Sequence, residues 1–226
     1  TTEIYTLSLH DALPISMYPP ASAPPGRAKI FTVLGLGLGA ISFGSILVRF
    51  AGEASPLVIA FYRMVSSLMI LAPFCLGGNL RPLLRFDRVR ILAGSALALH
   101  FAFWISSLSH TSVAVSVLLV NTSPVLVSAL SALLFAERMN RWGVTGIGLT
   151  LGGSVLLVEN DLSRLGDPTG AALALLGALA FGVYLVAGRK IRKTESLLQY
   201  VIPVYFIAAV VLGALVLAAG HPLRGF

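Results

Sequence analysis

The sequence predicts an all-α, polytopic membrane protein with about seven transmembrane helices. Three observations predict this fold class. The chain is 57% hydrophobic and only 11% charged, whereas soluble domains carry about 25% charged residues. Its apolar runs reach the roughly 20 helical residues that a bilayer requires. Basic residues cluster between these runs, and no alternation of apolar and polar residues recurs, which argues against a membrane barrel.

Seven apolar runs are expected to form the helices. Their expected bounds, in chain order, are 30–50, 56–76, 91–108, 112–135, 142–158, 169–188 and 197–219. When Lys and Arg are assigned to alternate sides of these spans, twelve fall on one side, three on the other, and Arg63 falls within a span. The positive-inside rule makes the first side, and with it the N-terminus, cytoplasmic.

The beginning of the chain differs from the rest. Residues 1–16 resemble the translation of a sequencing adapter, and we interpret them as an artefact. Residues 17–29 are rich in proline and are predicted to be a disordered cytoplasmic N-terminus.

An internal repeat is suggested by two similar stretches. The run 39–48 matches 177–186 at an offset of 138 residues. Five predicted spans separate their starts, so the second copy would insert in the opposite sense, as in many secondary transporters. Chance similarity between two helices rich in Gly and Ala is the alternative. On the repeat interpretation, 30–158 is a first five-helix repeat and 168–226 is part of a second, with three further spans expected.

Several short motifs follow one another in an order found in one transporter family. They lie at 54–56, Arg63, 106–114, 121–124, 137–138, 142–153 and 166–170. In these features the chain resembles the EamA-type members of the drug/metabolite transporter superfamily. The resemblance implies an inner-membrane carrier with ten helices in two inverted five-helix repeats. It also implies the export of amino acids, related metabolites or drugs.

Three polar residues are expected near the middle of adjacent spans. Arg63, His100 and Asn121 each lie about 12–15 Å from a span start, which predicts a shared aqueous cavity. No Asp or Glu lies within a predicted span, so Arg63 lacks an acidic partner there. Its fork of donors suits the carboxylate of a substrate. The alternative is a structural arginine bound to backbone carbonyls.

His100 and Trp104 are four residues apart and share a helix face. They are interpreted either as a cavity wall in which His100 relays protons, or as a neutral histidine hydrogen-bonded between helices with Trp104 packed beside it. Tyr62 and Tyr184 are weaker substrate-site candidates, because tyrosines often mark membrane interfaces.

Pro124 is predicted to kink its helix, because it removes the hydrogen bond to the carbonyl of Val120. Asn121 then either binds substrate or satisfies the freed backbone groups. Two Gly-xxx-Gly pairs, one at 35 and 39 and one at 148 and 152, are predicted to permit close helix packing.

A secondary transporter that works by alternating access around a midplane cavity is the function the sequence favours. A membrane-embedded enzyme would need a nucleophile–base pair or a motif such as HExxH, which the sequence lacks. The predicted cytoplasmic N-terminus argues against a seven-helix receptor. The expected partners are a small-molecule substrate and the lipid bilayer, and a homodimer is left open. No cofactor, metal or nucleic acid is expected.

Overall fold

The computed structural model describes residues 26–51, 54–75, 85–136, 140–158, 168–192 and 195–222. The adapter-like segment 1–16 and residues 17–25 lie outside these ranges, as do the motifs at 137–138 and 166–167. The described elements are α1 (Arg27–Phe50), α2 (Pro56–Leu71), the short 3-10 helix η2 (Ala72–Cys75), α3 (Arg88–Ser107), α4 (Val113–Val120), α5 (Ser123–Phe135), α6 (Arg141–Val158), α7 (Pro168–Ile191) and α8 (Leu197–Ala218).

The predicted fold class is confirmed, because every regular element in the described ranges is a helix. Six helical segments there are long and apolar enough to cross a membrane, with α4 and α5 counted together. The helix α6 occupies the fifth predicted run and is not among the six. Helices predominate because hydrocarbon offers the backbone no hydrogen bonds, so each span must satisfy its own.

The chain divides into two compact units, residues 1–43 and 44–226. The described part of the first unit is the start of α1, whose large apolar side chains, such as Phe31 and Leu36, are exposed. This helix begins at Arg27, so residues 27–29 are helical and not disordered as predicted. Arg, Ala and Lys are strong helix formers, which accounts for the earlier start.

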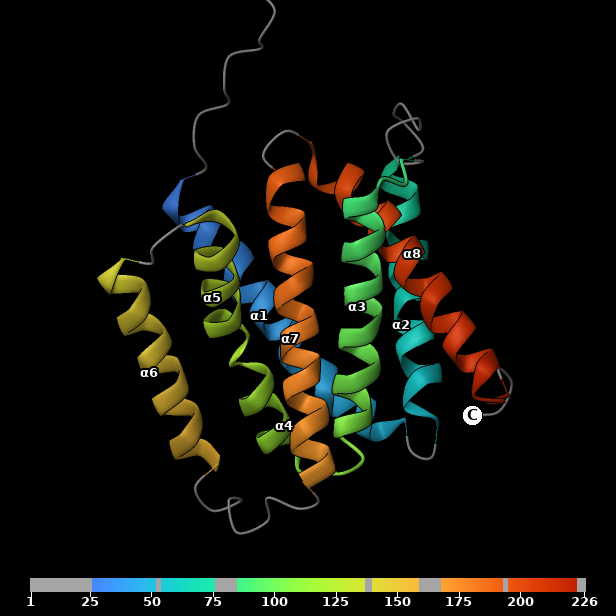
Figure 1. Cartoon of the computed structure of the whole chain (residues 1–226), viewed down its shortest axis with the longest axis horizontal. Coiled ribbons are helices and arrows are strands. Elements are labelled where there is room, and N and C mark those ends of the chain that lie inside the picture. The colour runs from blue at the N-terminus through green and yellow to red at the C-terminus, as the bar shows by residue number, and fades with distance from the viewer. Residues whose placement is uncertain are drawn as a thin grey trace, which may run out of the picture. The chain divides into compact units, whose positions relative to one another are not determined.

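The helix α3 is the centre of the second unit. It packs against α7 on one side and against α2 and α8 on the other (Figure 1). Small buried residues allow these approaches. A Cβ atom on Gly94 would lie 2.6 Å from Ile207 Cβ and 2.8 Å from the carbonyl oxygen of Val204, both on α8. A Cβ atom on Gly177 of α7 would lie 3.3 Å from the backbone nitrogen of Trp104.

The prediction that Gly148 and Gly152 permit close helix packing was wrong for the part of the chain that the structure describes. A Cβ atom on either glycine would meet nothing within 4 Å. The helix α6 packs against α4 without using these glycines for a close approach. A Gly-xxx-Gly motif permits a second helix to pack closely, but it does not determine whether a second helix lies there.

The fourth apolar run forms two helices instead of one kinked helix. The helix α4 ends at Val120 and α5 begins at Ser123. Pro124 has no N–H to offer the carbonyl of Val120, so the ladder stops there. The carbonyl of Thr122 starts the next ladder by accepting from the N–H of Val125 at 2.9 Å. The predicted effect of Pro124 is thus present as a break of two residues.

Side-chain caps fix the beginnings of α3 and α8. The Asp87 carboxylate accepts hydrogen bonds at 3.0 Å from the backbone N–H groups of both Val89 and Arg90. Ser196 and Gln199 form a reciprocal capping box at the start of α8. These caps satisfy backbone donors that a helix start otherwise leaves without partners.

Replacing Asp87 by Ala should lower the free energy of unfolding by at least about 0.5–2 kcal/mol, the usual cost of losing such a cap, because the ion pair to the buried Arg90 is lost as well. Desolvation by burial alone would raise the pKa of Asp87, but hydrogen bonds from Arg90 hold that pKa below its ordinary value of 3.8. A carboxyl group with a lowered folded-state pKa stabilises the fold when ionised. This contribution is present above the ordinary pKa and is lost as pH falls through the folded-state pKa.

Thermal unfolding in detergent at neutral and at strongly acidic pH checks this prediction. The difference between wild type and Asp87→Ala should shrink in acid. Asp87→Asn, which keeps a capping oxygen but no charge, should show the smaller effect at neutral pH. A difference that does not change with pH would contradict an ionised cap.

Candidate functional site

Arg63 lies in the middle of α2, about 10 Å along the helix from Pro56. Its side chain is partly buried against α3. The guanidinium carbon Cζ lies 4.8 Å from the ring centroid of Phe101 and 5.5 Å from that of Trp104. A Cβ atom on Gly44 would lie 3.3 Å from Arg63 Nη1, so the glycine leaves room for the guanidinium. The cation is therefore held against two aromatic faces.

No carboxylate pairs with Arg63 among the residues that the structure describes. Tyr205 on α8 interacts with it electrostatically. A cation over an aromatic face gains about 0.5–2 kcal/mol, depending on how far it is desolvated. Two faces can therefore offset much of the roughly 2.5–3.5 kcal/mol that an arginine costs at a helix centre. They do not satisfy the guanidinium N–H donors, which lie in its plane.

His100 on α3 is buried and reaches across to α7. Its Nδ1 lies 2.9 Å from the carbonyl oxygen of Gly177. A carbonyl oxygen only accepts, so Nδ1 carries the hydrogen and donates. The close approach of α7 at Gly177 brings this carbonyl within reach. The contact matches the interpretation of His100 as a histidine hydrogen-bonded between helices, while its role as a proton relay stays a prediction.

Aromatic rings extend from this point along α7 to α8. His100 lies 4.6 Å from Phe181 between ring centroids, Phe181 lies 5.8 Å from Tyr184, and Tyr184 lies 6.3 Å from Tyr200. The ring of His100 is also parallel to that of Trp104, with 3° between their planes. We refer to the connected rings as the aromatic column, which consists of Phe101, Trp104, His100, Phe181, Tyr184 and Tyr200.

Two polar atoms in the aromatic column are buried without a hydrogen-bond partner in the described part of the chain. They are Trp104 Nε1 and Tyr200 Oη. Leaving a buried polar group unpaired costs about 1–3 kcal/mol. Together with the guanidinium of Arg63, these atoms give the column a surplus of hydrogen-bond donors. Such a surplus favours a ligand that presents acceptors.

The structure brings together four of the predicted site residues, namely Arg63, His100, Trp104 and Tyr184. Tyr62 is 36% exposed, and its ring lies edge-on to that of Phe61. Consecutive helix residues point about 100° apart, so Tyr62 does not share the direction of Arg63. Asn121 is exposed in the break between α4 and α5. Within the described ranges, no hydrogen bond, ion pair or ring contact joins Asn121 to the aromatic column.

Sequence reasoning missed four residues that contribute to this site. They are Phe101, Phe181, Tyr200 and Tyr205. One sequence signal was present. Phe181 and Tyr184 are three residues apart, a spacing that places both rings on one helix face. No local pattern showed that this face meets His100.

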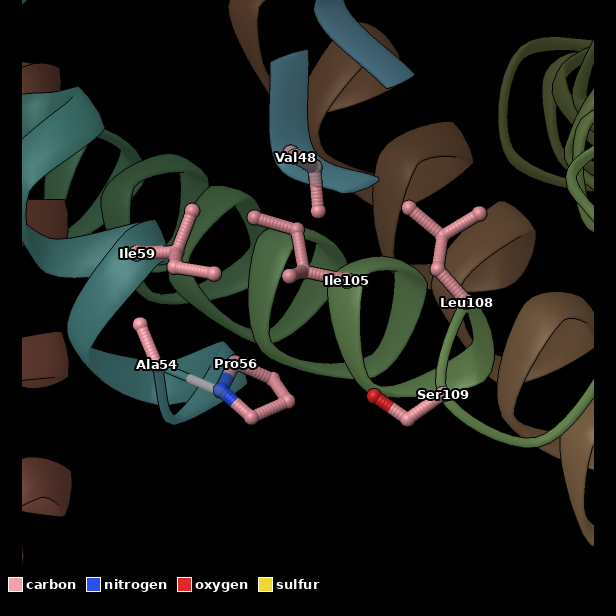
Figure 2. A pocket seen from close by; sticks show the side chains of 7 residues that line it. All are labelled: Val48, Ala54, Pro56, Ile59, Ile105, Leu108 and Ser109. Carbon is pink, nitrogen blue, oxygen red and sulfur yellow. The ribbon is translucent and has the colours of Figure 1, made fainter. Parts of the chain in front are cut away.

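A separate cavity of about 220 Å³ lies where α3 ends (Figure 2). Its walls come from the end of α1, the beginning of α2 and the end of α3, and six of its seven lining residues have apolar side chains. The lining residues are Val48, Ala54, Pro56, Ile59, Ile105, Leu108 and Ser109. Figure 2 shows the side chains of Val48 and Ile105 approaching each other across it.

Comparison with known proteins supports the fold and identifies the family. A solved structure described only as "Crystal structure of protein" is similar to this chain, with a TM-score of 0.63 and 22% sequence identity. The similarity covers 88% of this chain and 70% of that chain, and it supports the fold alone. No curated protein matches. The sequence pattern of the EamA-like transporter family matches residues 28–159, which is more than half of the chain. The chain therefore belongs to the EamA-like transporter family.

Proposed function

We propose that the protein is a secondary transporter of the inner membrane that exports small metabolites, such as amino acids or drugs, around a substrate site centred on Arg63. Membership of the EamA-like transporter family supports transport. The observation that carries the proposed site is the guanidinium of Arg63. It lies in mid-span over Phe101 and Trp104 and has no acidic partner among the described residues.

The proposed site would bind the substrate through a charged group and through an apolar surface. The guanidinium N–H groups of Arg63 would bind a carboxylate through two parallel hydrogen bonds. The aromatic column would contact the apolar part of the substrate, and Trp104 Nε1 could donate a further hydrogen bond. In a poorly hydrated site each of these hydrogen bonds is stronger than in water. His100 would hold α3 and α7 together beside the substrate.

Alternating access would expose this site to each face of the membrane in turn. The distribution of Lys and Arg supports a cytoplasmic N-terminus and makes the face at which α3 begins cytoplasmic. Transport would then require that the two repeats tilt against each other, with the contacts of α3 to α7 and α8 changing.

Uptake by the full chain reconstituted into liposomes tests the proposal. A panel of small aromatic and aliphatic carboxylic acids is offered, each beside the matching amide, and the accumulated compounds are measured by mass spectrometry. We expect at least one acid to accumulate and its amide to be excluded. Equal uptake of acid and amide would contradict the role of Arg63. Accumulation no greater than in protein-free liposomes would contradict the transport function.

A further inference from the structure

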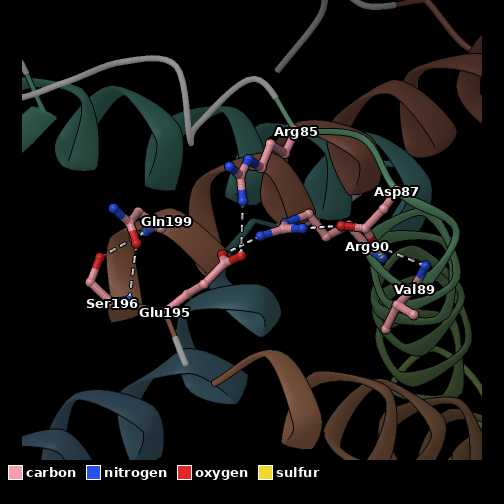
Figure 3. A network of polar contacts seen from close by, with 7 residues as sticks. All are labelled: Arg85, Asp87, Val89, Arg90, Glu195, Ser196 and Gln199. Atoms are coloured by element: carbon pink, nitrogen blue, oxygen red, sulfur yellow. Dashed lines mark hydrogen bonds and ion pairs between the residues drawn. The ribbon is translucent and has the colours of Figure 1, made fainter. Parts of the chain in front are cut away.

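An ion-pair network joins the beginning of α3 to the connection between α7 and α8 (Figure 3). Its central residue is Arg90, whose side chain is only 2% exposed and which pairs with both Asp87 and Glu195. Arg85 lies at the rim, with its Nη1 3.7 Å from Glu195 Oε1 and its side chain 65% exposed. We refer to Asp87, Arg90 and Glu195 as the triad.

The triad lies next to one end of the aromatic column. Glu195 is followed by the capping box of α8, and Tyr200 lies one turn later. Tyr200 interacts electrostatically with Arg90. The last ring of the column is therefore close to the ion pairs. The triad joins the beginning of α3 to the residues just before α8. Arg63 lies over Phe101 and Trp104 of α3 and interacts electrostatically with Tyr205 of α8.

The opposite end of α3 is built differently. The cavity of about 220 Å³ is lined there by Ile105, Leu108 and Ser109. Arg90 and Ser107 are about 25 Å apart along the helix. Thus ion pairs around the buried Arg90 lie near the Tyr200 end of the column, while a cavity lies at the opposite end of α3. A carrier closed on one face has this asymmetry.

We propose that the triad is a gate that closes the substrate passage on the face at which α3 begins. This proposal rests on the proposed transport function and assigns part of its conformational change to named residues. Opening the gate is energetically costly, because separating a buried arginine from its acidic partner is strongly destabilising. It can still open, because the side chains of Glu195 and Asp87 are 19% and 44% exposed, so water can hydrate both carboxylates after they separate from Arg90.

Cysteine labelling of the full chain tests the gate without a substrate. The background is Cys75→Ser, which removes the only native cysteine. Tyr184→Cys then reports access to the aromatic column, and Phe86→Cys, exposed beside the triad, identifies the membrane face. A membrane-impermeant maleimide is applied to that face and to the opposite one. When Glu195→Gln is added to the Tyr184→Cys variant, labelling of the introduced thiol from the Phe86 face should become about tenfold faster or more.

Four further variants make the result decisive. Arg85→Gln removes a charge from the exposed rim and should change the rate less than about twofold. Arg90→Gln should resemble Glu195→Gln, and the double variant should add little, because either loss opens the same gate. If Glu195→Gln does not fold, Glu195→Asp should give a smaller increase in the same direction.

An unchanged rate in folded Glu195→Gln, or an increase only from the face opposite Phe86, would overturn the gate. Labelling and uptake are scored separately. If the wild type takes up acids and labelling is unchanged in the variants, the gate fails alone. If labelling rises in the variants but no compound accumulates, the transport function fails while the triad still controls access to the column.

Discussion

Uptake of the transported acid should fall about 10- to 100-fold when Arg63 is replaced by Ala. A hydrogen bond to a charged group contributes about 1.5–3 kcal/mol, and about 1.4 kcal/mol corresponds to a factor of ten. Arg63→Lys keeps the charge but loses the planar fork of donors. Its uptake should therefore lie between those of wild type and Arg63→Ala. Initial rates in liposomes at several concentrations measure both effects.

The chain offers a matched control for Arg63. Arg141 also lies over an aromatic ring, with Cζ 5.8 Å from the centroid of Trp142, but this pair is at the exposed beginning of α6, where Trp142 is 72% exposed. Arg141→Ala should leave uptake unchanged. Full uptake by a correctly folded Arg63→Ala protein would reject Arg63 as a substrate ligand. A loss that is equal in both variants would point to a general effect of removing positive charge.

Replacing Gly94 by Val should lower the thermal stability of the protein. The new Cβ atom would lie 2.6 Å from Ile207 Cβ and 2.8 Å from the backbone oxygen of Val204. These atoms belong to the body of α8 and cannot move aside alone. Overpacking costs about 1–3 kcal/mol or more. At about 2–4 °C per kcal/mol for a chain of this size, the melting temperature in detergent should fall by about 2–12 °C.

Gly148 provides the comparison for Gly94. It also lies within a helix, but a Cβ atom there would meet nothing within 4 Å. Gly148→Val should therefore shift the melting temperature by less than about 2 °C, since only helix propensity changes. Equal shifts in the two variants would mean that the contact between α3 and α8 does not limit stability.

That each apolar run is helical could be predicted because the bilayer imposes it. An apolar run must form its own hydrogen bonds and must be long enough to cross, and both properties are visible locally. The break in the fourth run was partly visible as well, because the missing N–H of Pro124 is a property of one residue. The size of the break depended on how Thr122 begins the next helix, which the pattern of apolar residues does not encode.

The site was harder to predict because spans that are apolar all round carry little information about which face meets a neighbour. Counting residues from the end of a span gives only the depth of a side chain in the membrane. Asn121 and Arg63 have similar predicted depths, so depth could not distinguish them. The structure separates them, with Arg63 against α3 and Asn121 exposed. The glycines show the same limit. Gly94 is closely packed and Gly148 is not, although only Gly148 belongs to a recognisable motif.

The break between α4 and α5 has an electrical consequence for this part of the molecule. The end of one helix carries a partial negative charge, and the beginning of the next carries a partial positive charge. At residues 121–122 these two poles come close together in the middle of an apolar run. Hydrocarbon cannot solvate such poles, so the exposed side of Asn121 requires either water or another stretch of polypeptide beside it.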